Sequence, residues 1–282
     1  MKNHSKSVFY GKSWKPGLVG LMMLIGICSC NNKGAISASS TSEDTTETST
    51  TEVADSKEGL KLKNFTKEAP TFGGEKSSID CDYPVAGNPT LVQNIREWIN
   101  DRLGGSYEGD LNNAEAMFNF YAKTLSKDEE GMQILSVTEI KKVYENTKIV
   151  TFTCSGYTCL EGAAHGVGGE IGATFRKSDG KLFTADMVSS VHSQEMQAFI
   201  KKGLKEYFEI TSDSELKEYL IDVNNLNEIP LPSADPWITE KGVNFSYMPY
   251  EIASYAAGQP SFVVPTKDIK KNTNTAGKTF FE

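Results

Sequence analysis

The side chains with the widest chemical range in this chain lie between Cys154 and His165. His165 follows Glu161 by four residues, and a carboxylate beside an imidazole can act as an acid/base pair or bind a metal ion. The two would share one face of a helix, but the glycines around His165 disfavour a helix there. We therefore expect His165 to serve as a hydrogen-bonding group, with contact to a binding partner as the functional alternative. Catalysis is the remote possibility.

No metal ion and no cofactor is predicted. A zinc site needs three or four ligands, and besides His165 the chain offers only His192 and His4, which lies in the leader discussed below. The glycines of 162–172 do not form a dinucleotide-binding motif, and 276–279 imitates the end of a phosphate-binding loop without its first glycine. We expect no nucleotide site.

Cys154 and Cys159 could supply a nucleophile or a disulfide. A catalytic thiolate needs a histidine that polarises it, and His165 is close in sequence. The leader indicates export, and thiols outside the cytosol tend to be oxidised. We therefore expect a Cys154–Cys159 bridge first, a bridge from Cys81 to either of them second, and a catalytic thiol last.

Aromatic residues near the C-terminus are the second group of candidates. Trp237, Tyr250, Glu251 and Tyr255 form a predicted binding surface, because Trp and Tyr bury a large area at small entropic cost. The structural alternative is that Tyr250 and Tyr255 cover the core. The complete set of predicted binding residues is Tyr157, Glu161, His165, Trp237, Tyr250, Glu251 and Tyr255.

The spacing of apolar residues and the capping and turn residues predict the helices and strands that position these groups. Asn88 followed by Pro89 predicts the start of a helix that runs to Leu103, and Gly104 ends it. The clearest helix spans 193–208, where apolar residues recur on one face. Further helices are predicted over 112–126 and 213–220, and extended segments over 60–87, 133–144, 148–155, 173–176, 181–183, 243–247 and 262–264. Paired hairpins with helices on one face predict an α+β fold with antiparallel sheets and two lobes.

The N-terminus has the pattern of a bacterial lipoprotein. Four lysines precede the apolar run LVGLMMLIGICSC, and polar residues follow Cys30 at once. We expect residues 1–29 to be a signal peptide and Cys30 to carry the lipid. Eleven of the fifteen residues of 37–51 are Ser or Thr, so 30–59 should be a disordered stalk.

The charge balance excludes one class of partner. The whole chain has a formal net charge of −8. Removing residues 1–29 takes away four lysines and leaves 25 basic against 37 acidic residues, a charge of −12. Nucleic acid is therefore not an expected partner. A cationic protein is compatible with this surface, and so is simple solubility.

Two motifs resemble a known family. They are YTCLEGAAHGVGGEIGATFRKSDGKLF at 157–183 and FSYMPYEIASYAAGQPSFVV at 245–264. Together they are similar to the RsiV-like family, the extracellular domain of anti-sigma-V factors and of related lipoproteins of unknown function. A neighbouring module of that family, also found beside peptidoglycan-deacetylase domains, resembles the preceding part of the chain. The resemblance implies an outer binding domain, and lysozyme is what such a domain senses.

The sequence thus predicts four segments. They are the signal peptide 1–29, the stalk 30–59, a deacetylase-associated module over 60–160 and an RsiV-like domain over 161–282. We expect an exported binding protein, not an enzyme, held in the cell envelope by the lipid on Cys30, at the outer membrane. Its expected ligand is lysozyme, another cationic protein or cell-wall glycan. An accessory hydrolase or deacetylase and an envelope scaffold are the alternatives.

Overall fold

The computed structural model describes residues 59–128, 130–189 and 191–281. The predicted signal peptide, Cys30 and all but the last residue of the predicted stalk lie outside them. The strands are β1 (Lys61–Pro70), β2 (Lys76–Ala86), β3 (Ile134–Glu145), β4 (Ile149–Leu160), β5 (Val167–Arg176), β6 (Trp237–Thr239), β7 (Gly242–Ser246) and β8 (Ser261–Val264). The helices are α1 (Pro89–Arg102), α2 (Ala114–Ala122), α3 (Gln194–Tyr207), α4 (Asp213–Tyr219), α5 (Thr266–Ile269) and α6 (Thr275–Lys278).

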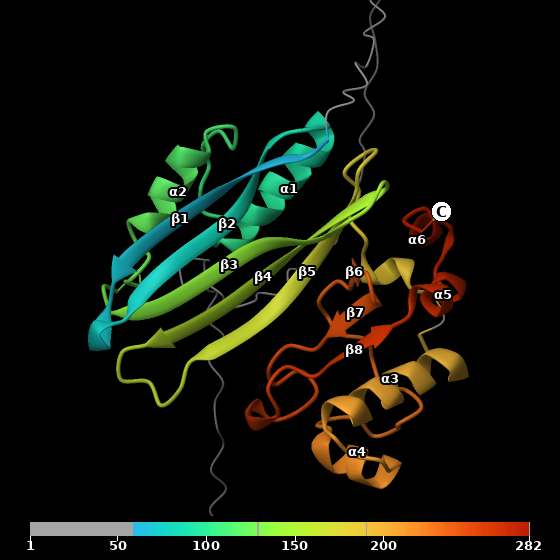
Figure 1. Cartoon of the computed structure of the whole chain (residues 1–282). Coiled ribbons are helices and arrows are strands. Elements are labelled where there is room, and N and C mark those ends of the chain that lie inside the picture. The colour runs from blue at the N-terminus through green and yellow to red at the C-terminus, as the bar shows by residue number, and fades with distance from the viewer. Residues whose placement is uncertain (1–58, 129, 190, 282) are drawn as a thin grey trace, which may run out of the picture.

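The larger sheet has five strands in the order β1-β2-β3-β4-β5 (Figure 1). Neighbouring strands are antiparallel except β2 and β3, which are parallel, so the expectation of purely antiparallel sheets is wrong for this pair. The reason is the connection: the chain forms α1 and α2 after β2 and re-enters the sheet in the same direction, as a long crossover allows.

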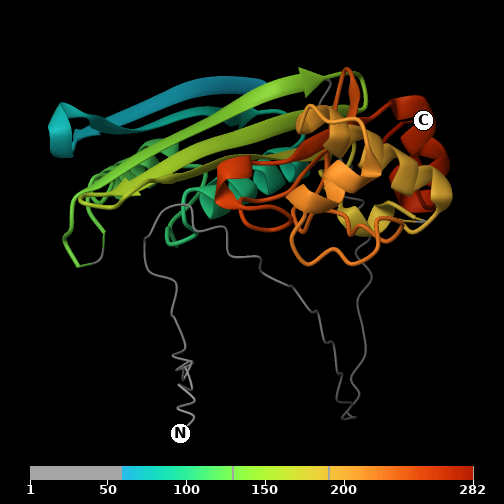
Figure 2. The same ribbon diagram turned by 90° about the horizontal axis from the view of Figure 1, so that it is seen from below.

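Both α1 and α2 cover one face of this sheet (Figure 2). Helix α1 begins as predicted: the Asn88 side chain accepts hydrogen bonds from two backbone N–H groups of the first turn, and Pro89 needs none. Leu91, Ile95 and Ile99 then point inward and are at most 2% exposed. They join the apolar core between helices and sheet. The prediction of an α+β fold with helices on one face of the sheet is confirmed.

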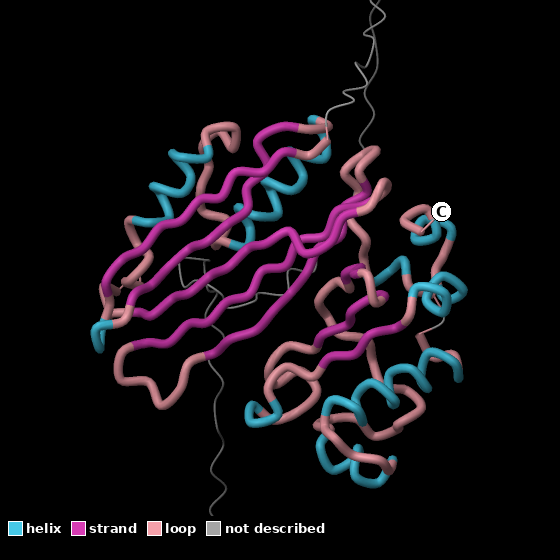
Figure 3. The backbone as a smooth tube through the Cα atoms, in the orientation of Figure 1, coloured by secondary structure: helices cyan, strands magenta, loops and turns pink. Residues whose placement is uncertain are grey.

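The C-terminal lobe contains the second sheet, β6-β7-β8, which is antiparallel throughout (Figure 3). Helix α3 packs on β8 and is capped by the side chain of Ser193, which accepts from the Met196 N–H. The approach is close: a Cβ atom at Gly203 would lie 2.1 Å from the Cβ of Phe262. Ile200 and Leu204 are fully buried there. None of the helices in the described ranges is long and apolar enough to cross a bilayer.

The two lobes meet where β6 packs on β5. Ile238 donates its N–H to the Thr174 hydroxyl at 2.8 Å, and its carbonyl accepts from the Thr151 hydroxyl at 2.7 Å. The ring of Trp237 lies over Gly172, where a Cβ atom would be 2.2 Å from the indole. The predicted boundary at residue 160 falls between β4 and β5, which pair along their length, whereas the two sheets separate after β5.

Candidate functional site

An aromatic cluster forms where β4 ends and β5 begins. Tyr157 of β4 lies opposite Gly168 of β5 in the antiparallel register. A Cβ atom at Gly166 would be 2.4 Å from the Tyr157 ring, so these glycines let the ring lie close against the backbone of β5. The glycine-rich segment predicted to lead into a strand at 173 is therefore already strand from Val167.

His165 and Tyr255 stack at this position. Their ring centroids are 4.1 Å apart and the planes differ by 24°. The Gly166 carbonyl accepts a hydrogen bond from the Tyr255 hydroxyl at 2.5 Å, and Nδ1 of His165 lies 3.1 Å from the same oxygen. The expected hydrogen-bonding role of His165 is thus present, together with an exposed ring that a partner can reach.

Tyr250 extends the stack outward. Its ring centroid is 5.5 Å from that of Tyr255, and the residue is 58% exposed. The backbone of Tyr250 has φ of 70°, a left-handed conformation that a bulky residue adopts at a cost on the order of 1 kcal/mol. Strain of this kind persists where the surroundings enforce it. We name Tyr250, Tyr255 and His165 the aromatic row.

Glu251 and Trp237 make contacts within the fold: Glu251 through hydrogen bonds and Trp237 through packing. The Glu251 carboxylate accepts from the N–H of Ser233 at 2.6 Å and from the N–H of Met248 at 2.7 Å, which fixes the turn that carries Tyr250. Trp237 is 7% exposed because it fills the space over Gly172. Both residues support the fold around the aromatic row: Trp237 is buried, and Glu251 is partly exposed.

Glu161 lies in the exposed turn after β4, and its N–H donates to the Gln133 carbonyl. Its carboxylate makes no hydrogen bond or ion pair with His165 among the described residues. His192 is exposed on a separate turn. Nowhere in the described ranges do three His, Cys, Asp or Glu side chains gather as metal ligands would.

The predicted disulfides do not fit this structure, in which Cys81, Cys154 and Cys159 are free. Cys154 and Cys159 are five residues apart on one strand, hence about 16 Å apart and on opposite faces of the sheet. Cys81 and Cys154 flank Ile140 of the intervening strand, roughly two strand spacings of 4.8 Å from each other. A bridge requires Cα atoms within about 7 Å, and Cys81 and Cys159 point to opposite faces. The expectation of a bridge is corrected.

Gln259 is a residue of this site that the sequence did not reveal. Its side-chain amide accepts from the N–H of Glu170 at 2.7 Å and donates to the Glu170 carbonyl at 2.6 Å. It thereby covers part of the outer edge of β5 as another strand would. Tyr207 of α3 donates to the Ala257 carbonyl at 2.8 Å. These contacts hold the loop of the aromatic row in place. Neither contact can be predicted from a local sequence pattern.

Comparisons with known proteins find similarity in the C-terminal part. Residues 181–267 match the family model "Protein of unknown function (DUF3298)". A crystal structure of a DUF3298 family member from Bacteroides fragilis NCTC 9343 is similar with a TM-score of 0.61 and 13% identity, covering 78% of this chain and 96% of that one. A crystal structure of a DUF3298 family protein from Pseudomonas aeruginosa PAO1 has a TM-score of 0.53 and 17% identity. The match covers 77% of this chain and 96% of that one. No curated protein matches the chain.

Residues 181–267 are thus similar to the DUF3298 family of unknown function, and the similar structures confirm the α+β fold. At such identities they show the fold alone. The resemblance to the RsiV-like family remains a prediction from the two motifs at 157–183 and 245–264.

Proposed function

We propose that the protein is an exported, lipid-anchored binding protein of the cell envelope that captures a cationic protein such as lysozyme. The observation that carries the proposal is the aromatic row, three stacked rings that end in the exposed Tyr250. Rigid, exposed aromatic rings with fixed backbones are favourable anchors of an interface. Lysine and arginine side chains of a partner can also stack on such rings.

The charge next to the aromatic row supports a cationic partner. Asp80, Glu139, Ser155 and Glu170 are cross-strand neighbours in one row on β2 to β5. By the strand period this row is on the face that also carries Tyr157, opposite to α1 and α2. The Lys141 ammonium, 2.7 Å away, helps lower the pKa of Asp80, which stays ionised. Like charges on adjacent strands reduce sheet stability, and a cationic ligand would relieve this cost.

Cell-wall glycan is the second candidate. The open face of Tyr250 offers a flat apolar ring against which a sugar ring could pack. Glycan binding through that ring would be insensitive to salt, whereas binding of a cationic protein would weaken as salt screens the acidic row. The proposal assigns no catalytic residue.

The test is direct binding of the purified chain to c-type lysozyme at low and at high salt. We expect a salt-sensitive complex that Tyr250→Ala and Tyr255→Ala each weaken by about tenfold or more. The matched control is Tyr219→Ala, because Tyr219 is also an exposed tyrosine stacked on an aromatic ring, that of Phe208. Absence of a complex at micromolar protein, or equal losses in Tyr250→Ala and Tyr219→Ala, would refute the proposal. Salt-insensitive binding to isolated cell-wall glycan instead would support the second candidate.

A further inference from the structure

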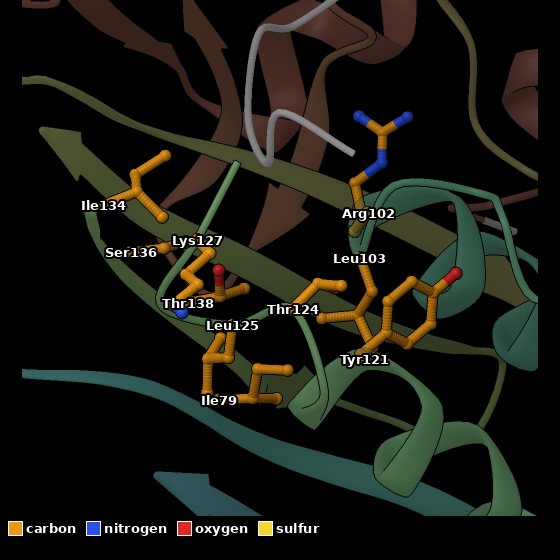
Figure 4. A pocket seen from close by; sticks show the side chains of 10 residues that line it. All are labelled: Ile79, Arg102, Leu103, Tyr121, Thr124, Leu125, Lys127, Ile134, Ser136 and Thr138. Carbon is orange, nitrogen blue, oxygen red and sulfur yellow. The ribbon is translucent and has the colours of Figure 1, made fainter. Parts of the chain in front are cut away.

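The two faces of the five-stranded sheet differ in the surface that they leave open. On the face covered by α1 and α2, the space between the end of α1, the segment after α2 and strands β2 and β3 is a cavity of about 40 Å³ (Figure 4). Such a cavity has room for a few water molecules, so it offers no docking surface for a protein. The opposite, outer face is open around Val137 and Tyr157, which are 36% and 40% exposed.

An apolar line on the outer face leads into the aromatic row. Val137 of β3 is the direct cross-strand partner of Tyr157 of β4, and Tyr157 is the partner of Gly168 of β5. The Tyr157 ring lies against Gly166, whose carbonyl accepts the hydrogen bond from Tyr255. Exposed apolar surface therefore continues from β3 to the aromatic row.

The acidic row beside this line contains two carboxylates that have no partner. Glu139 and Glu170 are exposed, and neither side chain makes a hydrogen bond or an ion pair with any described residue. Asp80 of the same row differs, because it is bonded to Lys141. Glu139 and Glu170 lie on either side of Ser155, two strand spacings or about 10 Å apart. Basic side chains of one partner can therefore face both.

The aromatic row alone is too small to hold a protein. A stable protein–protein interface buries about 800 Å² on each partner. A fully buried aromatic side chain contributes about 150–250 Å², and the rings of the row are already partly covered, so together they offer roughly 300 Å². The remaining contact must come from surface next to the row, and the outer face of the sheet supplies it.

We propose that the cationic protein captured by the aromatic row also docks on the outer face of the five-stranded sheet. Its basic side chains face Glu139 and Glu170, and an apolar side chain between them packs on Val137 and Tyr157. Covering two unpaired carboxylates requires counter-charges, which a cationic protein brings and which neutral glycan or a second copy of this acidic chain does not. This inference rests on the proposed function and defines the footprint of the partner on this chain.

The experiment measures the binding of the purified full chain to c-type lysozyme by titration calorimetry at low and at high salt. The double variant Glu139→Gln/Glu170→Gln keeps the shape of both side chains and removes their charges. It should weaken the complex by about fivefold or more at low salt and by less at high salt. The matched control is Glu97→Gln/Glu108→Gln, which removes the same charge from exposed positions on α1 and the segment after it. This control should weaken the complex by less than about twofold.

The apolar contact is tested by Val137→Lys, which places a long charged side chain beside Tyr157. We expect binding to weaken by about fivefold or more. Val143→Lys adds the same charge at an exposed position about 20 Å away along β3, and it should bind lysozyme as the unaltered protein does. Circular dichroism should show that every variant keeps the fold, because all four substituted glutamates and both valines are exposed.

The outcomes separate this footprint from the proposed function. A complex that Tyr250→Ala weakens, but that neither Glu139→Gln/Glu170→Gln nor Val137→Lys affects, would overturn the footprint and leave the proposed function standing. Absence of any complex would refute both. Equal losses in the two glutamine double variants would show that net charge and not this face determines binding, and would also overturn the inference.

Discussion

Single side chains of this protein depart from their ordinary chemistry where the fold buries them, and the thiols are the clearest case. Cys81 and Cys154 are at most 1% exposed. Burial raises the pKa of the Cys154 thiol to about 12 and that of Cys81 well above its ordinary range. The thiolate is the reactive form, so neither residue can act as a nucleophile at neutral pH. Cys159 is on the outer face and partly exposed.

We therefore expect iodoacetamide to modify Cys159 in the folded protein and to leave Cys81 and Cys154 unmodified. Peptide mass spectrometry after short exposure at neutral pH measures the three sites separately. The control is the same reaction in denaturant, where all three should react. Rapid labelling of Cys154 in the folded state, or a mass that shows a bridge between any two of them, would contradict this assignment.

Asp235 is a half-buried group whose pKa is also altered. Burial raises the pKa of its carboxyl, and the nearby Asp186 adds to the rise, although the Ala185 N–H donates to Asp235 at 2.8 Å. Because the folded-state pKa exceeds the unfolded one, folding favours the protonated form. This stabilising contribution is complete below the ordinary pKa of aspartate and is lost as the pH rises through the raised value.

Asp235→Asn should consequently raise the free energy of unfolding at neutral pH, because it removes the charge that partial burial disfavours. The amide oxygen can still accept from the Ala185 N–H. Chemical unfolding at several pH values measures the difference, which should disappear towards pH 3. Glu240→Gln, at an exposed turn, is the control for charge removal. A gain that is the same at every pH would show that ionisation of Asp235 is not its cause.

At the scale of elements, β6 is attached to the larger sheet by threonine side chains, which make the hydrogen bonds that the backbone of a neighbouring strand would otherwise make. The Ile238 N–H donates to Thr174, the two threonine hydroxyls lie 2.9 Å apart, and Thr151 donates to the Ile238 carbonyl. Thr151 and Thr174 are fully buried. Both backbone groups of Ile238 are thus satisfied without a ladder between the sheets.

Thr174→Val should lower the free energy of unfolding by about 1–3 kcal/mol, because it leaves the buried Ile238 N–H without an acceptor. Denaturant unfolding of the two proteins measures this loss. Thr66→Val serves as the control, since Thr66 is exposed and its hydroxyl bonds only to a neighbouring exposed side chain, Asn64. A loss of equal size in both variants would show that β-sheet propensity, not the hydroxyl bridge, determines the result.

The sequence predicted those elements whose signals are local. The helix start at Asn88 and the helix over 193–208 are each predicted from residues within or next to the helix itself, and both helices are confirmed. The parallel pairing of β2 with β3 depends on residues far apart in the chain. Likewise, Gly166 and Gly172 are glycines because Tyr157 and Trp237 cover them, and only the fold shows this. For the same reason the sequence placed Trp237 and Glu251 on a binding surface. Their residue types are common in interfaces, and only the fold shows their contacts with the rest of the chain.

At the scale of the whole molecule, the two apolar cores are distinct but share a strand. The core of the first lobe includes Val150 of β4, and that of the second includes Ile149 of the same strand, at the end where the lobes meet. Trp237, Gln259 and the threonine pair then fix the C-terminal lobe on β5. An edge strand buried by both lobes cannot unfold with one of them alone without exposing the other.

We accordingly expect the described region to unfold in one cooperative transition. In scanning calorimetry the calorimetric enthalpy should equal the van't Hoff enthalpy, and the circular dichroism of the helices should change at the same midpoint. Thr174→Val should lower that single midpoint without splitting it if the lobes remain coupled through Trp237 and Gln259. Two separate transitions in the unaltered protein would mean that the lobes are independent, and the aromatic row, which requires both β5 and the Tyr250–Tyr255 loop, would then be lost when the weaker lobe melts.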